Sequence, residues 1–130
     1  MNRYQFIATA LLMISCNDTT QKFDRQALDT KRHNIVSYIN TASCSTPSGC
    51  RAIAFGAKGC GGPWEFFIYP TTLDTAKLIQ LVDAYTQEEK SFNLKWKVIS
   101  DCSLVTLPDS TRCVNGTCFG YWGGVARRQE

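Results

Sequence analysis

Cysteine is the residue type whose number and spacing say most about chemistry in this chain of 130 residues. The chain holds seven cysteines, an awkward number for a disulfide-bonded protein because one is left over. Setting Cys16 aside leaves an even set that can form three disulfides: Cys44, Cys50, Cys60, Cys102, Cys113 and Cys118. Disulfides persist in oxidising compartments, so this set predicts an extracytoplasmic protein. Zinc would require clustered Cys-x-x-Cys pairs in a reducing compartment, and no metal site is expected.

The pairing of the six cysteines is not selected by sequence alone. We predict one pair in the core and two pairs that close local loops: Cys60 with Cys102, Cys44 with Cys50, and Cys113 with Cys118. The last pair flanks Asn115-Gly116, a dipeptide that favours a two-residue hairpin turn. Such a hairpin places Cys113 opposite Cys118, with closely approaching Cα atoms.

Catalytic groups are poorly represented. His33 is the only histidine and falls in an expected exposed helix, so we expect a solvated surface residue. Any Ser–His–Asp arrangement would have to use it. Glu65 and Asp101 could form a carboxylate pair for acid–base work, but the sequence does not fix their separation. Residues 59–62 lack the helix and the lysine of a phosphate-binding loop. We therefore expect no enzymatic activity and no cofactor.

The N-terminus has the layout of a secretory signal peptide. A short positive segment, residues 1–5, precedes an apolar run, residues 6–14, that is too short for an ordinary membrane anchor. The run ends in Met13-Ile14-Ser15-Cys16, which resembles the lipobox of bacterial lipoproteins, although Met13 stands where leucine is usual. The resemblance implies that residues 1–15 are removed and that Cys16 is lipidated. It also implies anchoring to a membrane of the bacterial envelope, at the outer membrane or cell surface, facing an oxidising space.

The rest of the chain divides into a tether over residues 16–30, which begins at the lipidated Cys16, one domain over residues 31–123, and a loose basic tail over residues 124–130. Apolar residues at helical spacing predict a helix over residues 24–41. A second helix begins after Asp74, a good N-cap residue, and is expected to run to about Lys90.

Strands are expected between and after these helices. Gly61, Gly62 and Pro63 form a turn before the most apolar run of the domain, residues 64–69, which we interpret as a central strand covered on both faces. Further strands are expected over residues 51–55, 94–98, 103–107 and 119–122. The resulting prediction is an α+β fold: a small, disulfide-stapled antiparallel sheet with one or two helices packed on one face.

Composition and charge favour binding over chemistry. The net charge of +3 comes from basic residues spread along the chain, so no nucleic-acid partner is expected. A disulfide-braced domain pre-organises a loop for binding, which favours an inhibitor of secreted proteases. The candidate loops are residues 45–49, 56–62 and 108–112. The candidate binding residues are Lys58, Gly61, Gly62, Pro63, Arg112 and Trp122.

Two resemblances bear on this expectation. The Cys-Gly-Gly-Pro-Trp turn at residues 60–64 is similar to that of small exported bacterial proteins of unknown function. In size, lipobox and compartment the chain is also similar to the potempins, lipoproteins that inhibit proteases secreted by the same cell. This second likeness implies an inhibitor but transfers no residue. The alternative is an envelope structural or assembly protein, or a carbohydrate-binding lipoprotein, that uses exposed aromatic side chains.

Overall fold

The computed structural model describes the helix backbone from Arg3 and the side chains of residues 18–130. The signal peptide expected over residues 1–15 and the lipidation expected at Cys16 lie outside the residues described in full. In the part that is described, no helix has the length and apolar character needed to cross a membrane.

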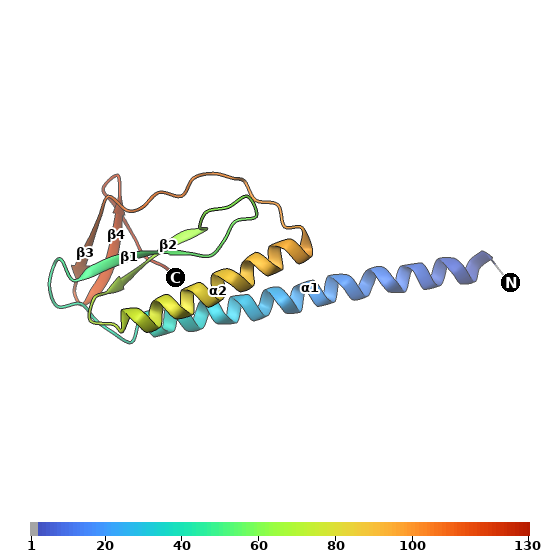
Figure 1. The fold of residues 1–130 in the computed structure, drawn as a ribbon, viewed down its shortest axis with the longest axis horizontal. Helices are drawn as coiled ribbons and strands as arrows, with labels where there is room; N and C mark the ends of the chain where they lie inside the picture. Colours follow the sequence, from blue (N-terminus) through green and yellow to red (C-terminus); the bar gives the residue numbers. More distant parts are fainter. Residues whose placement is uncertain (1–2) are drawn as a thin grey trace.

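Two helices and two small antiparallel sheets make up the fold, which confirms the α+β prediction (Figure 1). The elements follow one another as α1 (Arg3–Ile39), β1 (Cys50–Phe55), β2 (Glu65–Pro70), α2 (Thr75–Trp96), β3 (Ser110–Val114), β4 (Thr117–Trp122) and β5 (Val125–Arg127). One sheet is the pair β1–β2 and the other has the order β3–β4–β5. The pair β1–β2 lies between the helices and the second sheet, so the molecule has three layers.

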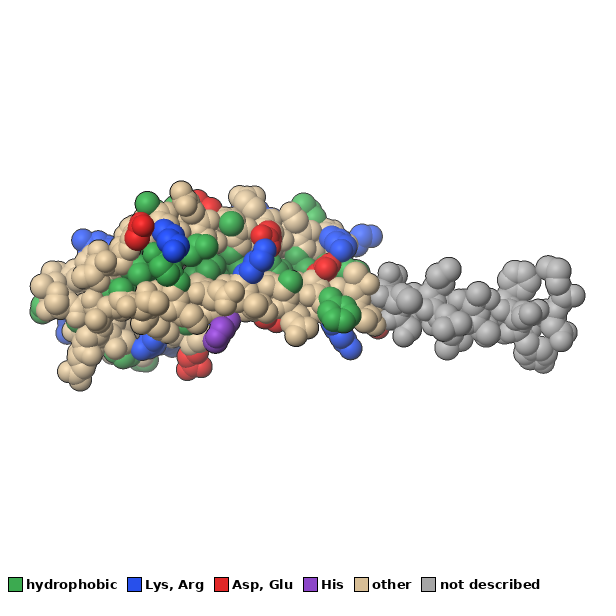
Figure 2. Space-filling view, turned by 90° about the horizontal axis from the view of Figure 1, so that it is seen from below, with side chains coloured by type: hydrophobic (Ala, Val, Ile, Leu, Met, Phe, Trp, Pro, Cys, Tyr) green, Lys and Arg blue, Asp and Glu red, His purple; other side chains and the backbone are tan. Residues whose placement is uncertain are grey.

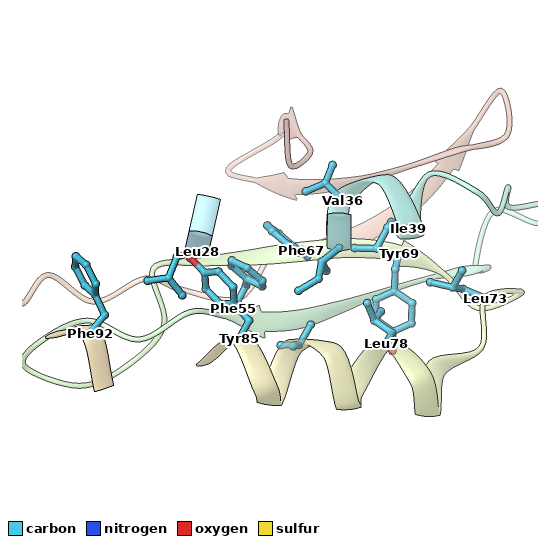
Figure 3. Close-up of a cluster of buried hydrophobic side chains, with 12 residues drawn as sticks. Leu28, Val36, Ile39, Phe55, Phe67, Tyr69, Leu73, Leu78, Tyr85 and Phe92 are labelled. Atoms are coloured by element: carbon cyan, nitrogen blue, oxygen red, sulfur yellow. The ribbon is translucent and has the colours of Figure 1, made fainter. Parts of the chain in front are cut away.

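The strand pair β1–β2 is covered on both faces because its side chains alternate between two cores. Phe55 and Phe67 face the helices, where their rings stack with centroids 3.9 Å apart and Tyr85 of α2 stacks on Phe55 at 4.4 Å (Figure 3). Cys50 and Ile68 face the second sheet and form a smaller core with Cys118. The double coverage expected for this run is therefore present, but its central position is not. Among the described strands, β2 pairs with β1 alone.

The free edge of β2 is closed by a side chain. Gln129, which is 5% exposed, accepts a hydrogen bond from the Ile68 N–H at 2.9 Å and donates one to the Ile68 C=O at 2.8 Å. The Arg32 guanidinium also donates to the Glu130 carbonyl at 2.7 Å. The tail expected to be loose over residues 124–130 instead forms β5 and supplies the hydrogen bonds that a neighbouring strand would make. The basic composition suggested a loose tail, but the tail is held in place because the backbone groups of Ile68 need hydrogen-bond partners.

Helix α2 begins as predicted and ends later. The Asp74 side chain accepts from the Lys77 N–H at 3.1 Å, and Leu73 before it is buried. The helix continues to Trp96 and is capped by Lys97 in the left-handed conformation (φ 51°), so it absorbs most of the strand expected over residues 94–98. The physical reason is tertiary: Phe92 and Asn93 are buried against the rest of the domain, whereas Leu94 is 82% exposed.

Helix α1 covers the segment expected to be a tether. Residues 18–30 are helical and carry Leu28 into the core at 4% exposure. Asp24 accepts hydrogen bonds from Lys95 Nζ at 2.6 Å and from Trp96 Nε1 at 3.0 Å. Asp24, in the segment expected to be a tether, thus joins the two packed helices. On the helix side, acidic and basic side chains are intermingled and the single histidine lies at the surface, in line with the expectation for His33 (Figure 2).

Two of the three predicted disulfide pairs are wrong. The hairpin at Asn115-Gly116 places Cys113 opposite Cys118 as expected, but neither bonds to the other. Each bonds instead to a cysteine near β1, across the interface between the sheets: Cys44–Cys113 (Cα–Cα 5.8 Å) and Cys50–Cys118 (5.7 Å). The cause is the docking of the second sheet on β1, which brings cysteines distant in sequence within bonding range. The third pair, Cys60–Cys102, is present as predicted (Cα–Cα 5.7 Å), but both cysteines are exposed, so its predicted place in the core is wrong.

Candidate functional site

A long segment between α2 and β3, residues 98–109, has neither helix nor strand and is named the crossing loop here. It arches across the domain from the end of α2 to the start of β3 (Figure 1). Large apolar side chains stand in solvent along it: Ile99 is 93% exposed, Leu104 94% and Leu107 61%. The strand expected over residues 103–107 is absent: these residues pair with no other strand. The crossing loop is the candidate site.

A disulfide fixes the first half of the crossing loop. Cys102 bonds to Cys60, which lies in the exposed turn of residues 59–62. Gly61 and Gly62 adopt positive φ values of 100° and 80° in this turn, and the Lys58 N–H donates to the Gly62 C=O at 2.9 Å. The glycines predicted as binding residues thus shape the turn that holds the loop, because positive φ is open to glycine at little cost.

Lys58 is the second brace and the centre of the site. Its residue is only 6% exposed, and its ammonium donates to the Asp101 carboxylate at 2.8 Å, the Ser103 C=O at 2.8 Å and the Ser103 Oγ at 3.0 Å. A buried ammonium needs three partners to offset its lost hydration, and the crossing loop supplies all three. Lys58 was predicted to bind a partner protein directly. It is not accessible for that role and binds the loop instead.

Trp122 braces the second half of the crossing loop. Its Nε1–H donates to the Thr106 C=O at 3.0 Å. The indole ring lies on Gly120, where an added Cβ would come within 2.8 Å of it, so a side chain at Gly120 would displace the ring. Asp109 completes this end, since its N–H donates to the Tyr121 C=O at 2.8 Å. The exposed ligand-binding role predicted for Trp122 is replaced by a half-buried bracing role.

Helix α2 positions the backbone from which Lys58 extends. Two side chains one helical turn apart hold Ala57: Glu89 accepts from its N–H at 2.8 Å and Asn93 donates to its C=O at 2.7 Å. Both side chains are buried. The preceding Gly56 has φ 76° and leaves no room for a Cβ, which would lie 2.7 Å from the Glu89 carboxylate. Helix α2 therefore holds Ala57 in place, and the next residue, Lys58, holds Ser103, the residue before Leu104.

The Lys58 contact changes the acidity of Asp101. The pKa of Asp101 is lowered from 3.8 to about 2. The main cause is the hydrogen bond from Lys58, and the hydrogen bonds from the Ser103 side chain and backbone add to it. Because this pKa is depressed in the folded protein, the contact is fully present above about pH 4 and is lost as the pH falls through 2. We expect the Asp101 carboxyl carbon to titrate near pH 2 by NMR, and the pKa of Asp101 to be higher in Lys58→Met, which removes the largest cause of the shift. A wild-type midpoint close to 4 would contradict the contact.

A groove of about 420 Å³ runs beside the second half of the crossing loop. Residues 104–106 form one wall, and the aromatic side chains of Trp64, Phe66 and Trp122 form much of the other. Trp64 was expected in the core but is 38% exposed here. Residues 104–106 thus line the groove, and the Leu104 side chain is 94% exposed.

The remaining predicted site residues lie elsewhere. Pro63 follows the turn at the start of β2, and Arg112 is exposed on β3 with its guanidinium 5.4 Å from the Tyr121 ring centroid. The carboxylates considered for acid–base work have separate cationic partners, since Glu65 pairs with Arg32 at 2.8 Å and Asp101 pairs with Lys58. Sequence reasoning missed Leu104 and Ser103, because nothing local distinguishes their segment from a half-buried strand.

Sulfur atoms gather between the sheets. The Sγ atoms of Cys44, Cys50 and Cys118 lie within 4.8 Å of one another and are buried. Each belongs to a disulfide, so this cluster reflects two adjacent bridges. The disulfides fit an oxidising extracytoplasmic compartment. Comparison with protein-family models, with curated proteins and with solved structures finds no match to this chain. The chemistry of the site is therefore argued from its own geometry.

Proposed function

We propose that this protein is a lipid-anchored, extracytoplasmic inhibitor of secreted proteases and that the crossing loop is its inhibitory segment. The observation that carries the proposal is the fixed backbone of an exposed loop. Ser103 and Thr106 both have their carbonyls held by side chains of the domain, Lys58 and Trp122, while the side chain between them at Leu104 stands in solvent. A binding segment already held in one conformation loses less entropy on association.

Resistance to digestion favours the same role. An inhibitor must survive contact with the enzyme it blocks, and proteases cleave segments that can open locally. The crossing loop is tied to the domain by the Cys60–Cys102 disulfide and by the buried ammonium of Lys58. These ties oppose the local opening that productive cleavage requires.

The aromatic side chains do not favour the carbohydrate-binding alternative. A sugar platform requires exposed rings side by side. Trp122 is half-buried and donates its N–H to Thr106, and Trp96 donates its N–H to Asp24 on the helix side of the molecule. Trp64 is partly exposed but is in contact with the Lys58 ammonium, 5.3 Å from its ring centroid.

The test is inhibition by the purified, oxidised protein and by one bracing variant. We expect stoichiometric loss of activity for one class among serine, cysteine and metalloproteases, measured as residual activity against molar ratio. Lys58→Met removes three hydrogen bonds to the loop and should weaken inhibition by at least about tenfold, because the loop must then be ordered on binding. The matched control is Lys90→Met on the exposed face of α2. Full protease activity at large excess of inhibitor would refute the proposal.

A further inference from the structure

The crossing loop also indicates which enzyme it fits. Resting on the proposed function, we infer that Leu104 is the side chain that enters the specificity pocket of the target, and that the target is a serine protease whose pocket is apolar. The substrate class is thus a leucyl peptide bond, Leu104–Val105, presented to a protease of the chymotrypsin-like or elastase-like specificity type.

Leu104 is singled out by what surrounds it. It is 94% exposed, yet the chain is fixed immediately before it at Ser103 and shortly after it at Thr106. The disulfide at Cys102 lies two residues before it. An exposed leucine on a rigid backbone is an unfavourable arrangement for a free protein, and burying it in a partner's apolar pocket removes that disadvantage.

Three other exposed apolar residues lack this setting. Leu94 lies on helix α2, and a helical backbone cannot be laid into a protease active-site cleft as an extended strand. Leu107 is followed by Pro108, so the bond after it carries no N–H and is imidic. Ile99 is 93% exposed but lies near the helix cap, before the disulfide and the Lys58 contact that fix the loop. Leu94, which is 82% exposed and lies outside the crossing loop, is therefore the comparison for Leu104.

Cleavage of Leu104–Val105 would not release either half of the chain. The protease serine Oγ would attack the Leu104 carbonyl carbon, the C–N bond to Val105 would break, and the serine proton would pass through the histidine to the Val105 amine. Water would then release the Leu104 carboxylate. Cys44–Cys113 and Cys50–Cys118 keep the two pieces joined, and Cys60–Cys102 holds the new Leu104 end in place. The new amine therefore stays beside the acyl group, and re-formation of the bond competes with hydrolysis.

The experiment measures inhibition constants of the full oxidised protein against three serine proteases, with apolar, small apolar and acidic specificity pockets, and against one cysteine protease and one metalloprotease. We expect inhibition of an enzyme with an apolar pocket and a loss of at least about 100-fold in Leu104→Ala. Leu94→Ala, on the exposed face of α2 and outside the crossing loop, should leave the constant unchanged. Leu104→Lys should transfer inhibition to the enzyme with the acidic pocket. All three substitutions lie at exposed residues, and circular dichroism checks that the fold is retained.

The outcomes separate the inference from the proposed function. Inhibition of a cysteine protease or metalloprotease alone, or inhibition that Leu104→Ala does not weaken, overturns the assignment of Leu104 but keeps the protein an inhibitor. The same holds if mass spectrometry after long incubation finds the nick outside Leu104–Val105. Full activity of every enzyme in the panel overturns the proposed function, and the assignment of Leu104 with it.

Discussion

We expect replacement of Cys50 and Cys118 together by alanine to lower the free energy of unfolding by about 3 kcal/mol, although Cys44–Cys113 remains and keeps most of the same loop closed. The Cys50–Cys118 disulfide closes a loop between residues 68 apart in sequence and joins β1 to β4. Cys50 is fully buried and Cys118 is 6% exposed, so the smaller alanines also leave a space in the core between the sheets. Chemical denaturation of the oxidised variant and wild type measures the difference.

The surface disulfide gives the contrasting control. Cys60 and Cys102 are exposed, and their replacement by alanine leaves no cavity in either core. We expect a smaller loss of stability from that double variant and a larger loss of protease inhibition, because it frees the crossing loop. A larger loss of stability from the Cys60–Cys102 variant would contradict the assignment of Cys50–Cys118 as the disulfide that stabilises the core and of Cys60–Cys102 as the one that holds the crossing loop.

The second large effect is expected at Glu89. Its carboxylate is 2% exposed and accepts from the Ala57 N–H at 2.8 Å, from the Tyr85 hydroxyl at 3.3 Å and from Arg25 at 3.4 Å. Glu89→Ala leaves a buried backbone N–H and a buried hydroxyl without these partners, and we expect it to lower the free energy of unfolding by about 3 kcal/mol. The same denaturation experiment measures it.

The neighbouring glutamate is a matched control for Glu89. Glu88 lies one residue earlier on α2, is exposed, and pairs with the exposed Lys31. Because exposed ion pairs contribute little, Glu88→Ala should change stability by less than about 1 kcal/mol. Equal effects of the two substitutions would show that the hydrogen bond from the Ala57 N–H to Glu89 does not stabilise the domain. Glu89→Ala should also weaken protease inhibition, since Ala57 positions Lys58.

Local signals in the sequence predicted the features that depend on neighbouring residues. Asp74 and Leu73 fixed the start of α2 because a cap and its apolar contact lie within one turn. Asn115-Gly116 fixed the register of the hairpin for the same reason, with φ values of 50° and 80°. The α+β class followed from the order of such local elements.

The features that depend on distant partners could not be predicted in this way. Nothing beside Lys58 shows that its ammonium is buried, because its partners Asp101 and Ser103 lie more than 40 residues later. The extra turn of α2 depends on Asn93 holding Ala57, 36 residues earlier. The pairings of Cys44 and Cys50 depend on how the two sheets dock. From the sequence alone, a disulfide between Cys44 and Cys50 that closes the short loop between these two cysteines is equally compatible with the local geometry.

The order of the cysteines has a consequence for how the protein matures. Every disulfide joins an early cysteine to a late one, with separations of 69, 68 and 42 residues. A chain exported N-terminus first exposes Cys44 and Cys50 as free thiols before either native partner arrives, and oxidation at that stage joins them to each other. Their sulfurs lie within 4.8 Å of Cys118 in the folded protein, so the Cys118 thiolate can attack Cys50, which breaks the Cys44–Cys50 bond, forms Cys50–Cys118 and leaves Cys44 as a thiolate. A second oxidation, by a disulfide oxidant of the compartment, must then join Cys44 to Cys113. We therefore expect the maturation of an exported chain to depend on thiol–disulfide exchange as well as on oxidation.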